Sequence, residues 1–166
     1  MVKTKNISFT FREYFNIDEL EKNDRELVDA AMEASETAYA PYSLFRVGAA
    51  VRLASGIIVR GSNVENAAFP SGVCAERNVL ANCISNFRDD KPVAIAIAAM
   101  SENGFTENPV PPCGNCRQVI IEEETRNKNI IKVILTGRNK IQVIESCSHL
   151  LPLQFTKENL TSTDLH

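Results

Sequence analysis

The sequence predicts an α/β fold in which a mixed sheet is covered by helices on both faces. Two unbroken apolar runs, residues 93–100 and 130–136, are typical of strands buried on both faces. Each run follows a segment with a helical period, and a hairpin pattern precedes them, which gives the order β-β-α-β-α-β. Because a hairpin pairs its strands antiparallel, the sheet is expected to be mixed in direction.

The first expected helix begins at Asn23 and ends near Tyr39. Apolar residues recur along it at helical spacing, Asn23 opens a capping box, and Pro41 forbids continuation of the helix. The hairpin comes next, because Ser55-Gly56 is a two-residue turn signal between two runs rich in β-forming residues.

Two further helices are expected to begin at cysteines. The run CAERNVLANCISNF starts at Cys74, and CGNCRQVIIEEE starts at Cys113 after a loop closed by prolines. Residues 1–22 fit no element, so we interpret them as a mobile N-terminal extension to a single domain at 23–166. The apolar tail at 150–155 is expected to pack on the core or on a neighbouring chain.

Composition excludes several classes of protein. The formal net charge is −3 and no basic run is present, which disfavours a nucleic-acid partner. The sequence shows neither a signal peptide nor a run long enough to cross a membrane, so we expect a cytoplasmic protein without membrane contact. Five cysteines in a reducing compartment favour metal ligands and core residues over disulfides, and we assign Cys83 and Cys147 to the core.

Three cysteines and a glutamate form the strongest chemical signal. Cys113-Gly-Asn-Cys116 alone indicates either a metal clamp or a redox pair, and the sequence lacks the fourth ligand of a structural zinc site. Cys74 supplies a third thiolate and leaves one open position, as in catalytic zinc sites. C-x-E followed by P-C-x-x-C is the zinc-deaminase signature in its three-cysteine form. We therefore predict one zinc ion, with Glu76 as the catalytic proton carrier.

Charge at the predicted site suggests a role for an arginine. Helix N-termini favour the cysteine thiolates, but three thiolates leave the zinc site at −1, which raises the pKa of its water. We expect Arg77 to offset this charge by donating hydrogen bonds to the sulfurs, with Arg117 as a more ordinary, solvent-facing alternative. Glu76 then takes a proton from the water, passes it to the ring nitrogen and finally protonates the departing amine.

Four stretches give the chain a resemblance to the small cytidine deaminases of nucleoside salvage, which covers nearly everything after residue 24. They are PYSLFRVGAAV at 41–51, GSNVENAAFPSGVCAER at 61–77, PPCGNCRQV at 111–119 and LLPLQF at 150–155. The resemblance implies a three-layer α-β-α sandwich around a mixed, mainly five-stranded sheet. It also implies hydrolysis of cytidine and 2′-deoxycytidine to uridine and 2′-deoxyuridine plus ammonia, in a homotetramer with one zinc ion per subunit and shared active sites.

The resemblance also implies contacts with the nucleoside. Asn63 and Glu65 match residues that hydrogen-bond the ribose hydroxyls, and the backbone N–H of Ala75 matches a donor to the base carbonyl. Phe45 matches a pocket aromatic that packs near the base and sugar. Positions that match groups reaching a neighbouring subunit's site are Ala67, Phe69 and Phe155. Because Phe69 stands where many members carry tyrosine, its contact there is expected to be apolar.

Three alternatives stay open beside this interpretation. A blasticidin-S-type deaminase shares the signature and the size, although Asn63-Val-Glu-Asn66 together with Phe45 favours the nucleoside enzyme. A nucleotide or nucleic-acid deaminase would need basic residues for phosphate, which the acidic balance and Glu65 argue against. A non-catalytic zinc-binding module is the alternative from another class of protein, and it does not explain why Glu76 accompanies the ligands.

Overall fold

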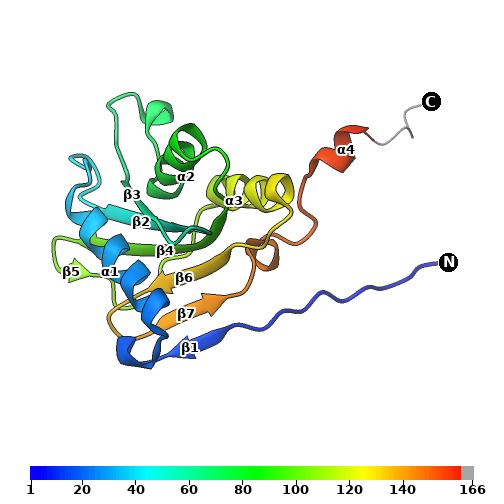
Figure 1. The fold of residues 1–166 in the computed structure, drawn as a ribbon, viewed down its shortest axis with the longest axis horizontal. Coiled ribbons are helices and arrows are strands. Elements are labelled where there is room, and N and C mark those ends of the chain that lie inside the picture. The colour runs from blue at the N-terminus through cyan, green and yellow to red at the C-terminus, as the bar shows by residue number, and fades with distance from the viewer. Residues whose placement is uncertain (162–166) are drawn as a thin grey trace.

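The computed structural model describes residues 1–161 and confirms the α/β class and the mixed sheet (Figure 1). The strands are β1 (Arg12–Tyr14), β2 (Arg46–Leu53), β3 (Ile58–Ser62), β4 (Pro92–Ser101), β5 (Gly104–Phe105), β6 (Lys132–Thr136) and β7 (Ile141–Ile144). The helices are α1 (Lys22–Glu36), α2 (Ala75–Asn86), α3 (Gly114–Asn127) and α4 (Lys157–Thr161). The sheet order is β1-β7-β6-β4-β2-β3, with β5 paired to β4. Strands β4 and β6, joined through α3, run parallel, and the other pairs are antiparallel.

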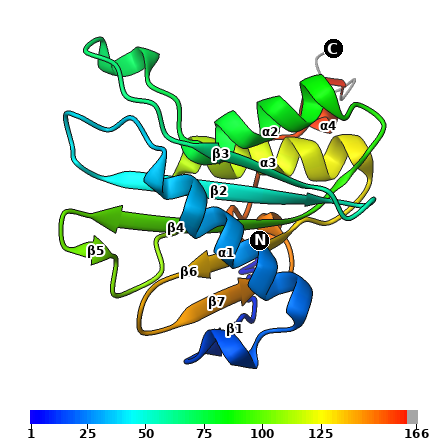
Figure 2. The same ribbon diagram turned by 60° about the vertical axis from the view of Figure 1, so that its left-hand side comes forward.

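The central strand β4 separates two apolar layers. Its alanines at 94, 96 and 98 belong to a cluster with Leu27 and Val28 of α1, whereas Ile95 and Ile97 belong to the cluster of α2 and α3. Side chains alternate between the faces of a strand, so one strand supplies both layers. Figure 2 shows α1 crossing one face of the sheet while α2 and α3 lie on the other. The small side chains on the α1 face let this helix approach closely.

The N-terminal extension contributes an edge strand that the sequence pattern did not indicate. Strand β1 pairs antiparallel with β7, in the register Arg12 to Val143 and Tyr14 to Ile141. Leu20, which follows β1, is buried in the cluster beneath α1. A three-residue strand is too short to show the alternation from which strands are predicted. The part of the extension from β1 onward is therefore integrated into the sheet and its core.

Two predicted helix starts agree with the structure, and the end of one helix differs. The capping box predicted at Asn23 is wrong, because α1 begins at Lys22 with Glu21 as its N-cap and no side chain caps it. Cys74 and Cys113 are the N-cap residues of α2 and α3. Helix α1 ends at Glu36, three residues before Tyr39. The backbone N–H of Tyr39 donates to the carbonyl of Asn63 at 3.1 Å, so β-type pairing with the chain after β3 replaces the last helical turn. Within residues 1–161, every helix is too short or too polar to cross a lipid bilayer.

The contact between α1 and β2 requires glycine at position 48. A Cβ atom there would lie 2.1 Å from the carbonyl oxygen of Ala31 and 2.3 Å from the amide nitrogen of Ser35. Both are backbone atoms of α1, which cannot rotate away. The separation of this helix from the sheet is therefore set by the absence of a side chain.

We predict that Gly48→Ala lowers the free energy of unfolding by about 3 kcal/mol, the upper end of the usual cost of overpacking. Gly114→Ala is the matched control, because a Cβ there meets nothing within 4 Å. Urea unfolding followed by circular dichroism measures both variants. Equal stability of the two would contradict this description of the α1 contact.

Candidate active site

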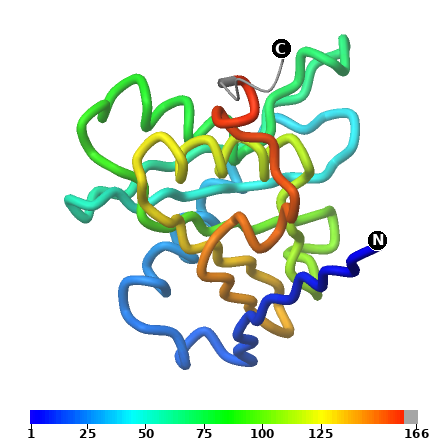
Figure 3. Tube along the Cα trace, turned by 90° about the vertical axis from the view of Figure 1, so that its right-hand side faces the viewer, coloured from blue at the N-terminus to red at the C-terminus, as the bar shows by residue number. Residues whose placement is uncertain are grey.

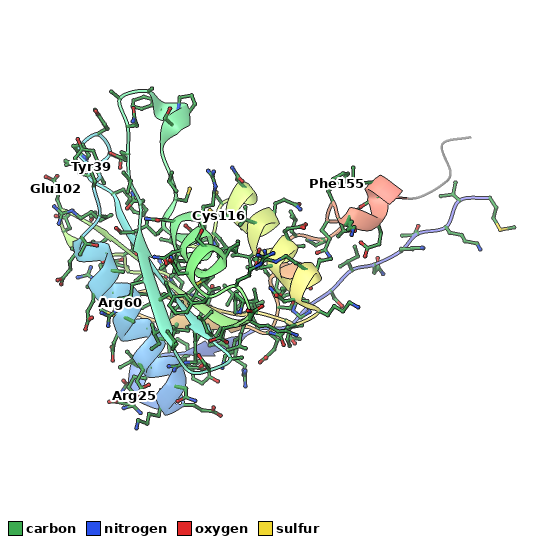
Figure 4. All side chains as sticks on the ribbon, turned by 45° about the horizontal axis from the view of Figure 1, so that its top comes forward. Arg25, Tyr39, Arg60, Glu102, Cys116 and Phe155 are labelled. Atoms are coloured by element: carbon green, nitrogen blue, oxygen red, sulfur yellow. The ribbon has the colours of Figure 1, made fainter. Side chains whose placement is uncertain are left out.

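Three cysteine sulfurs meet where α2 and α3 begin. Cys74 and Cys113 cap the two helices, and Cys116, labelled in Figure 4, lies in the first turn of α3. The three Sγ atoms lie within 4.8 Å of one another, and those of Cys113 and Cys116 are 3.3 Å apart. This distance exceeds the roughly 2.05 Å of a disulfide, and all three cysteines are free. The structure thus brings together the three predicted metal ligands.

The cluster fits a zinc ion by its donor set and its spacing. Tetrahedral thiolates at about 2.3 Å from zinc stand about 3.8 Å from one another, so small side-chain adjustments bring these sulfurs to ligand positions. Among the described residues, no other trio of cysteine, histidine or acidic side chains is close enough to hold a metal. Three protein ligands leave a fourth position for water or substrate, which is the arrangement of a catalytic zinc site.

The three thiols differ in how readily they ionise. Burial raises the pKa of Cys116, and the nearby charge of Glu76 raises it further. Burial also raises the pKa of Cys74. Burial opposes ionisation of Cys113 too, but hydrogen bonds, chiefly from the backbone N–H and thiol of Cys116, outweigh it and lower that pKa. Cys113 is also the exposed member of the cluster.

Glu76 lies in the first turn of α2 and is only 5% exposed. Burial raises the pKa of its carboxyl, with smaller opposing effects from its own backbone N–H and from the thiol of Cys116. After burial, its charge also contributes to raising the pKa values of Cys74 and Cys116. A buried carboxyl with a raised pKa beside a metal site is suited to accept and return protons near neutral pH.

The two arginines beside the ligands occupy different environments. Arg77, predicted to donate to the sulfurs, is half-buried, and its side chain makes no hydrogen bond to the sulfurs or to any other group within the described part of the chain. Arg117 is half-buried rather than solvent-facing. Its Nε donates to the carbonyl of Pro112 at 2.8 Å and its Nη1 to that of Leu150 at 2.7 Å. Arg117 therefore ties the residue before Cys113 to the C-terminal segment, a contact with no sequence signal.

Asn63 fixes the start of β2 and Phe45, the residue before it. Its Oδ1 accepts from the backbone N–H of Val47 at 2.7 Å, and its Nδ2 donates to the carbonyl of Phe45 at 3.0 Å. An amide side chain has two acceptor lone pairs and two N–H donors, so one of each stays free for a ligand. Phe45 itself is half-buried, with its backbone fixed by this amide.

Glu65 fixes the loop between α1 and β2. One carboxylate oxygen accepts from the backbone N–H groups of Tyr42 and Ser43, at 2.8 and 3.2 Å, and the other from the Ser43 hydroxyl at 2.5 Å. The Ser43 hydroxyl is the main cause that lowers the pKa of this carboxyl. Ser43 is not among the residues predicted for the site, because its position after Pro41-Tyr42 is the only feature of the sequence that marks it. The second oxygen of Glu65 keeps a lone pair for another donor.

A cavity of about 460 Å³ adjoins the sulfur cluster. This volume lies in the range of roughly 300–1,000 Å³ that is usual for small-molecule sites. Its lining includes Asn63, Glu65, Tyr42, Ser43, Phe69 and Cys74. The rings of Tyr42 and Phe69 meet edge to face, with centroids 6.0 Å apart. The predicted sugar ligands and one predicted metal ligand therefore line the same cavity.

None of the remaining predicted contacts lines this cavity, namely Phe45, Ala67, Ala75 and Phe155. Ala75 is fully buried as the first residue of α2, so its backbone N–H has no acceptor inside the helix. Ala67 is exposed on the loop between β3 and α2, which projects from the body of the fold in Figure 1. Phe155 is 57% exposed, does not line the cavity, and lies near α4, away from Cys116, in Figure 4. One chain alone does not bring Phe155 to its own site.

Comparison with known proteins gives consistent matches. Residues 21–132 match the model of the cytidine and deoxycytidylate deaminase zinc-binding region, which includes the three cysteines and Glu76. A cytidine deaminase from Halalkalibacterium halodurans is 42% identical over 134 residues, covering 81% of this chain and 95% of the relative. One from Sporosarcina psychrophila is 37% identical over 136 residues, covering 81% and 93%.

Solved structures agree with these matches. The crystal structure of cytidine deaminase from Burkholderia pseudomallei is similar with a TM-score of 0.67 at 38% identity, covering 78% of this chain and 97% of that one. The crystal structure of the enzyme from Mycobacterium tuberculosis gives 0.64 at 28%, covering 82% and 99%. The fold, the thiolate cluster and the matched region all agree, and the chain therefore belongs to the cytidine deaminase family and carries its zinc-binding region.

Proposed function

We propose that this protein hydrolyses cytidine and 2′-deoxycytidine to uridine and 2′-deoxyuridine, with release of ammonia, in pyrimidine salvage. The observation that carries the proposal is a cluster of three sulfurs that adjoins, through Cys74, a cavity large enough for a nucleoside. The buried Glu76 follows Cys74 by two residues. The relatives that cover most of this chain are named cytidine deaminases. Five free cysteines suit a reducing compartment, so we place the activity in the cytoplasm.

In this mechanism Cys74, Cys113 and Cys116 hold the metal and Glu76 moves the protons. The chemistry that a bound zinc supplies is a lowered pKa of water, which makes hydroxide available near neutral pH. Glu76 accepts a proton from the attacking water and gives it to the ring nitrogen beside the attacked carbon. It then takes the second proton of that water from the added hydroxyl and delivers it to the amino group, so the C–N bond breaks, ammonia leaves and the hydroxyl becomes the carbonyl of the product. Its burial keeps competing water away and holds the pKa above the ordinary range of a carboxyl.

The proposed selection of free nucleosides follows from the charges of the cavity. Asn63 and Glu65 keep free hydrogen-bonding capacity after fixing their loops, and ribose hydroxyls can use it. Among residues 1–161, no side chain lining the cavity is basic. An ionised Glu65 without a basic partner repels a phosphate group, so nucleotides are expected to be poor substrates.

The proposed assembly is a homotetramer whose subunits complete one another's sites. Phe69 is 75% exposed on the projecting loop, and Phe155 is exposed on the C-terminal segment. Exposed aromatic side chains held on ordered segments are typical of protein–protein contact sites. We infer that Ala67 and Phe69 reach toward a neighbour's site and that Phe155 packs against the base bound there.

We predict that Glu76→Gln keeps zinc and lowers the rate of cytidine deamination by about 10²–10⁴-fold, the usual contribution of general acid–base catalysis. Zinc content by atomic absorption and release of ammonia measure the two properties. The control is Glu122→Gln, which makes the same change on the exposed side of α3. A native rate in Glu76→Gln would remove this residue from the chemistry.

We predict that Cys113→Ala loses zinc and lowers the melting temperature, because metal binding contributes free energy to the folded state. Cys83→Ala is the matched control, since Cys83 is buried in the apolar cluster and lies outside the sulfur trio. This variant should lose some core packing but retain one zinc ion per chain. Full zinc content in Cys113→Ala would exclude Cys113 as a ligand.

A further inference from the structure

We propose that residues 6–11, here called the arm, position the C-terminal residues 150–156, here called the carrier segment. By holding this segment, the arm orients Phe155 toward the active site of a neighbouring subunit, and this second part of the proposal rests on the proposed function. The arm precedes residue 21, where the match to the family begins. The matched family model therefore does not account for the role of the arm.

The base of the arm is fixed to the sheet. Strand β1 pairs antiparallel with β7, so the chain before β1 runs beside the chain that follows β7. Arg12 forms an ion pair with Glu145, and the Glu13 carboxylate accepts from Gln142 at 2.8 Å. Figures 1 and 3 show the N-terminal residues leaving β1 and passing the segment that leads to the C-terminus. The pairing of β1 thus directs the arm toward the carrier segment.

Aromatic and aliphatic side chains join the arm to this part of the chain. The ring of Phe9 stacks on His149, with centroids 5.8 Å apart and an interplanar angle of 22°. Phe11 lies against Phe9, at 6.3 Å between centroids. A cavity of about 470 Å³ is bounded by Ile7 and Phe9 on one side and by carrier residues such as Leu151 on the other. The arm therefore flanks the carrier segment and stacks on the residue just before it.

Helix α3 holds the carrier segment at both ends. Arg117 donates to the carbonyl of Leu150 at 2.7 Å, and the side chain of Gln118 donates to the carbonyl of Phe155 at 2.8 Å. Both donors come directly after the ligand Cys116. The carrier segment is therefore attached to the helix that opens with two zinc ligands, and the arm flanks the residues between these attachments.

The carrier segment presents apolar side chains despite these attachments. Leu153 is 94% exposed and has a φ of 58°, a left-handed conformation that is costly for a residue of its size. Phe155 is 57% exposed although its backbone is fixed. An ordered segment with exposed apolar residues is suited to dock on another chain, and holding it in place beforehand lowers the entropic cost of docking. The arm supplies part of this order.

Hydrogen exchange of the full-length, zinc-loaded protein tests the structural half of the proposal. We expect Phe9→Ser to speed amide exchange in the carrier segment roughly three- to tenfold, the scale of one lost aromatic pair. Phe9→Tyr keeps the ring and should restore slow exchange. Val2→Ser is the control, because Val2 is fully exposed and does not line the cavity. Unchanged exchange in Phe9→Ser would overturn the proposal, whether or not the protein deaminates cytidine.

Kinetics test the link to Phe155. Phe9→Ser should raise the KM for cytidine severalfold with zinc content and kcat close to native, and Phe9→Tyr should reverse the change. If the arm acts through Phe155, adding Phe9→Ser to Phe155→Ala should cause no further rise in KM. An additive rise, or a lower melting temperature with an unchanged KM, would contradict the positioning role. A native protein inert on cytidine would refute the proposed function, and the exchange measurement would still decide whether the arm orders the carrier segment.

Discussion

The convergence of two helix N-termini on three sulfurs is the constraint on which the rest of this structure depends. Helices α2 and α3 can meet there because both pack on the same face of the sheet, through a shared cluster that includes Leu80 and Ile120. The opposite face carries α1, whose close approach at Gly48 requires a position without a side chain. The sheet thus holds the two helices at a separation that one metal ion can bridge, and it buries Glu76 beside that ion's ligands.

Several polar side chains near the cavity serve the fold and the proposed chemistry together. Asn63 and Glu65 use part of their hydrogen-bonding capacity to fix the backbone around Phe45 and Ser43, which shapes the cavity before any ligand arrives. The donor and acceptor positions of these two side chains that remain unused are available to the hydroxyls of a sugar. A site that is ordered in this way has less conformational entropy to lose on binding. The beginning of α3 also has two roles, because it supplies two of the proposed metal ligands and holds the C-terminal segment through hydrogen bonds.

The sequence predicted the parts of this site that depend on local pattern. The helix starts at Cys74 and Cys113 follow from helical spacing after turn residues, and the C-x-E and C-x-x-C spacing indicated the metal. Strand β1 was missed because three residues show no alternation, and it is held by its partner strand. The contact of Arg117 with the carbonyl of Leu150 joins residues 33 positions apart in the sequence, so only the tertiary fold brings them together. The proposed contacts between subunits depend on surfaces that the pattern of one chain does not define.

The most direct test of this account is a substrate panel with purified, zinc-loaded protein. Ammonia release is measured from cytidine, 2′-deoxycytidine, CMP and blasticidin S under the same conditions. The charges of the cavity and the free capacity of Asn63 and Glu65 predict turnover of the two free nucleosides alone. Turnover of CMP or blasticidin S at a rate similar to that of cytidine would contradict the assigned selectivity. A zinc-loaded protein inert on all four would contradict the assignment of this site to nucleoside deamination.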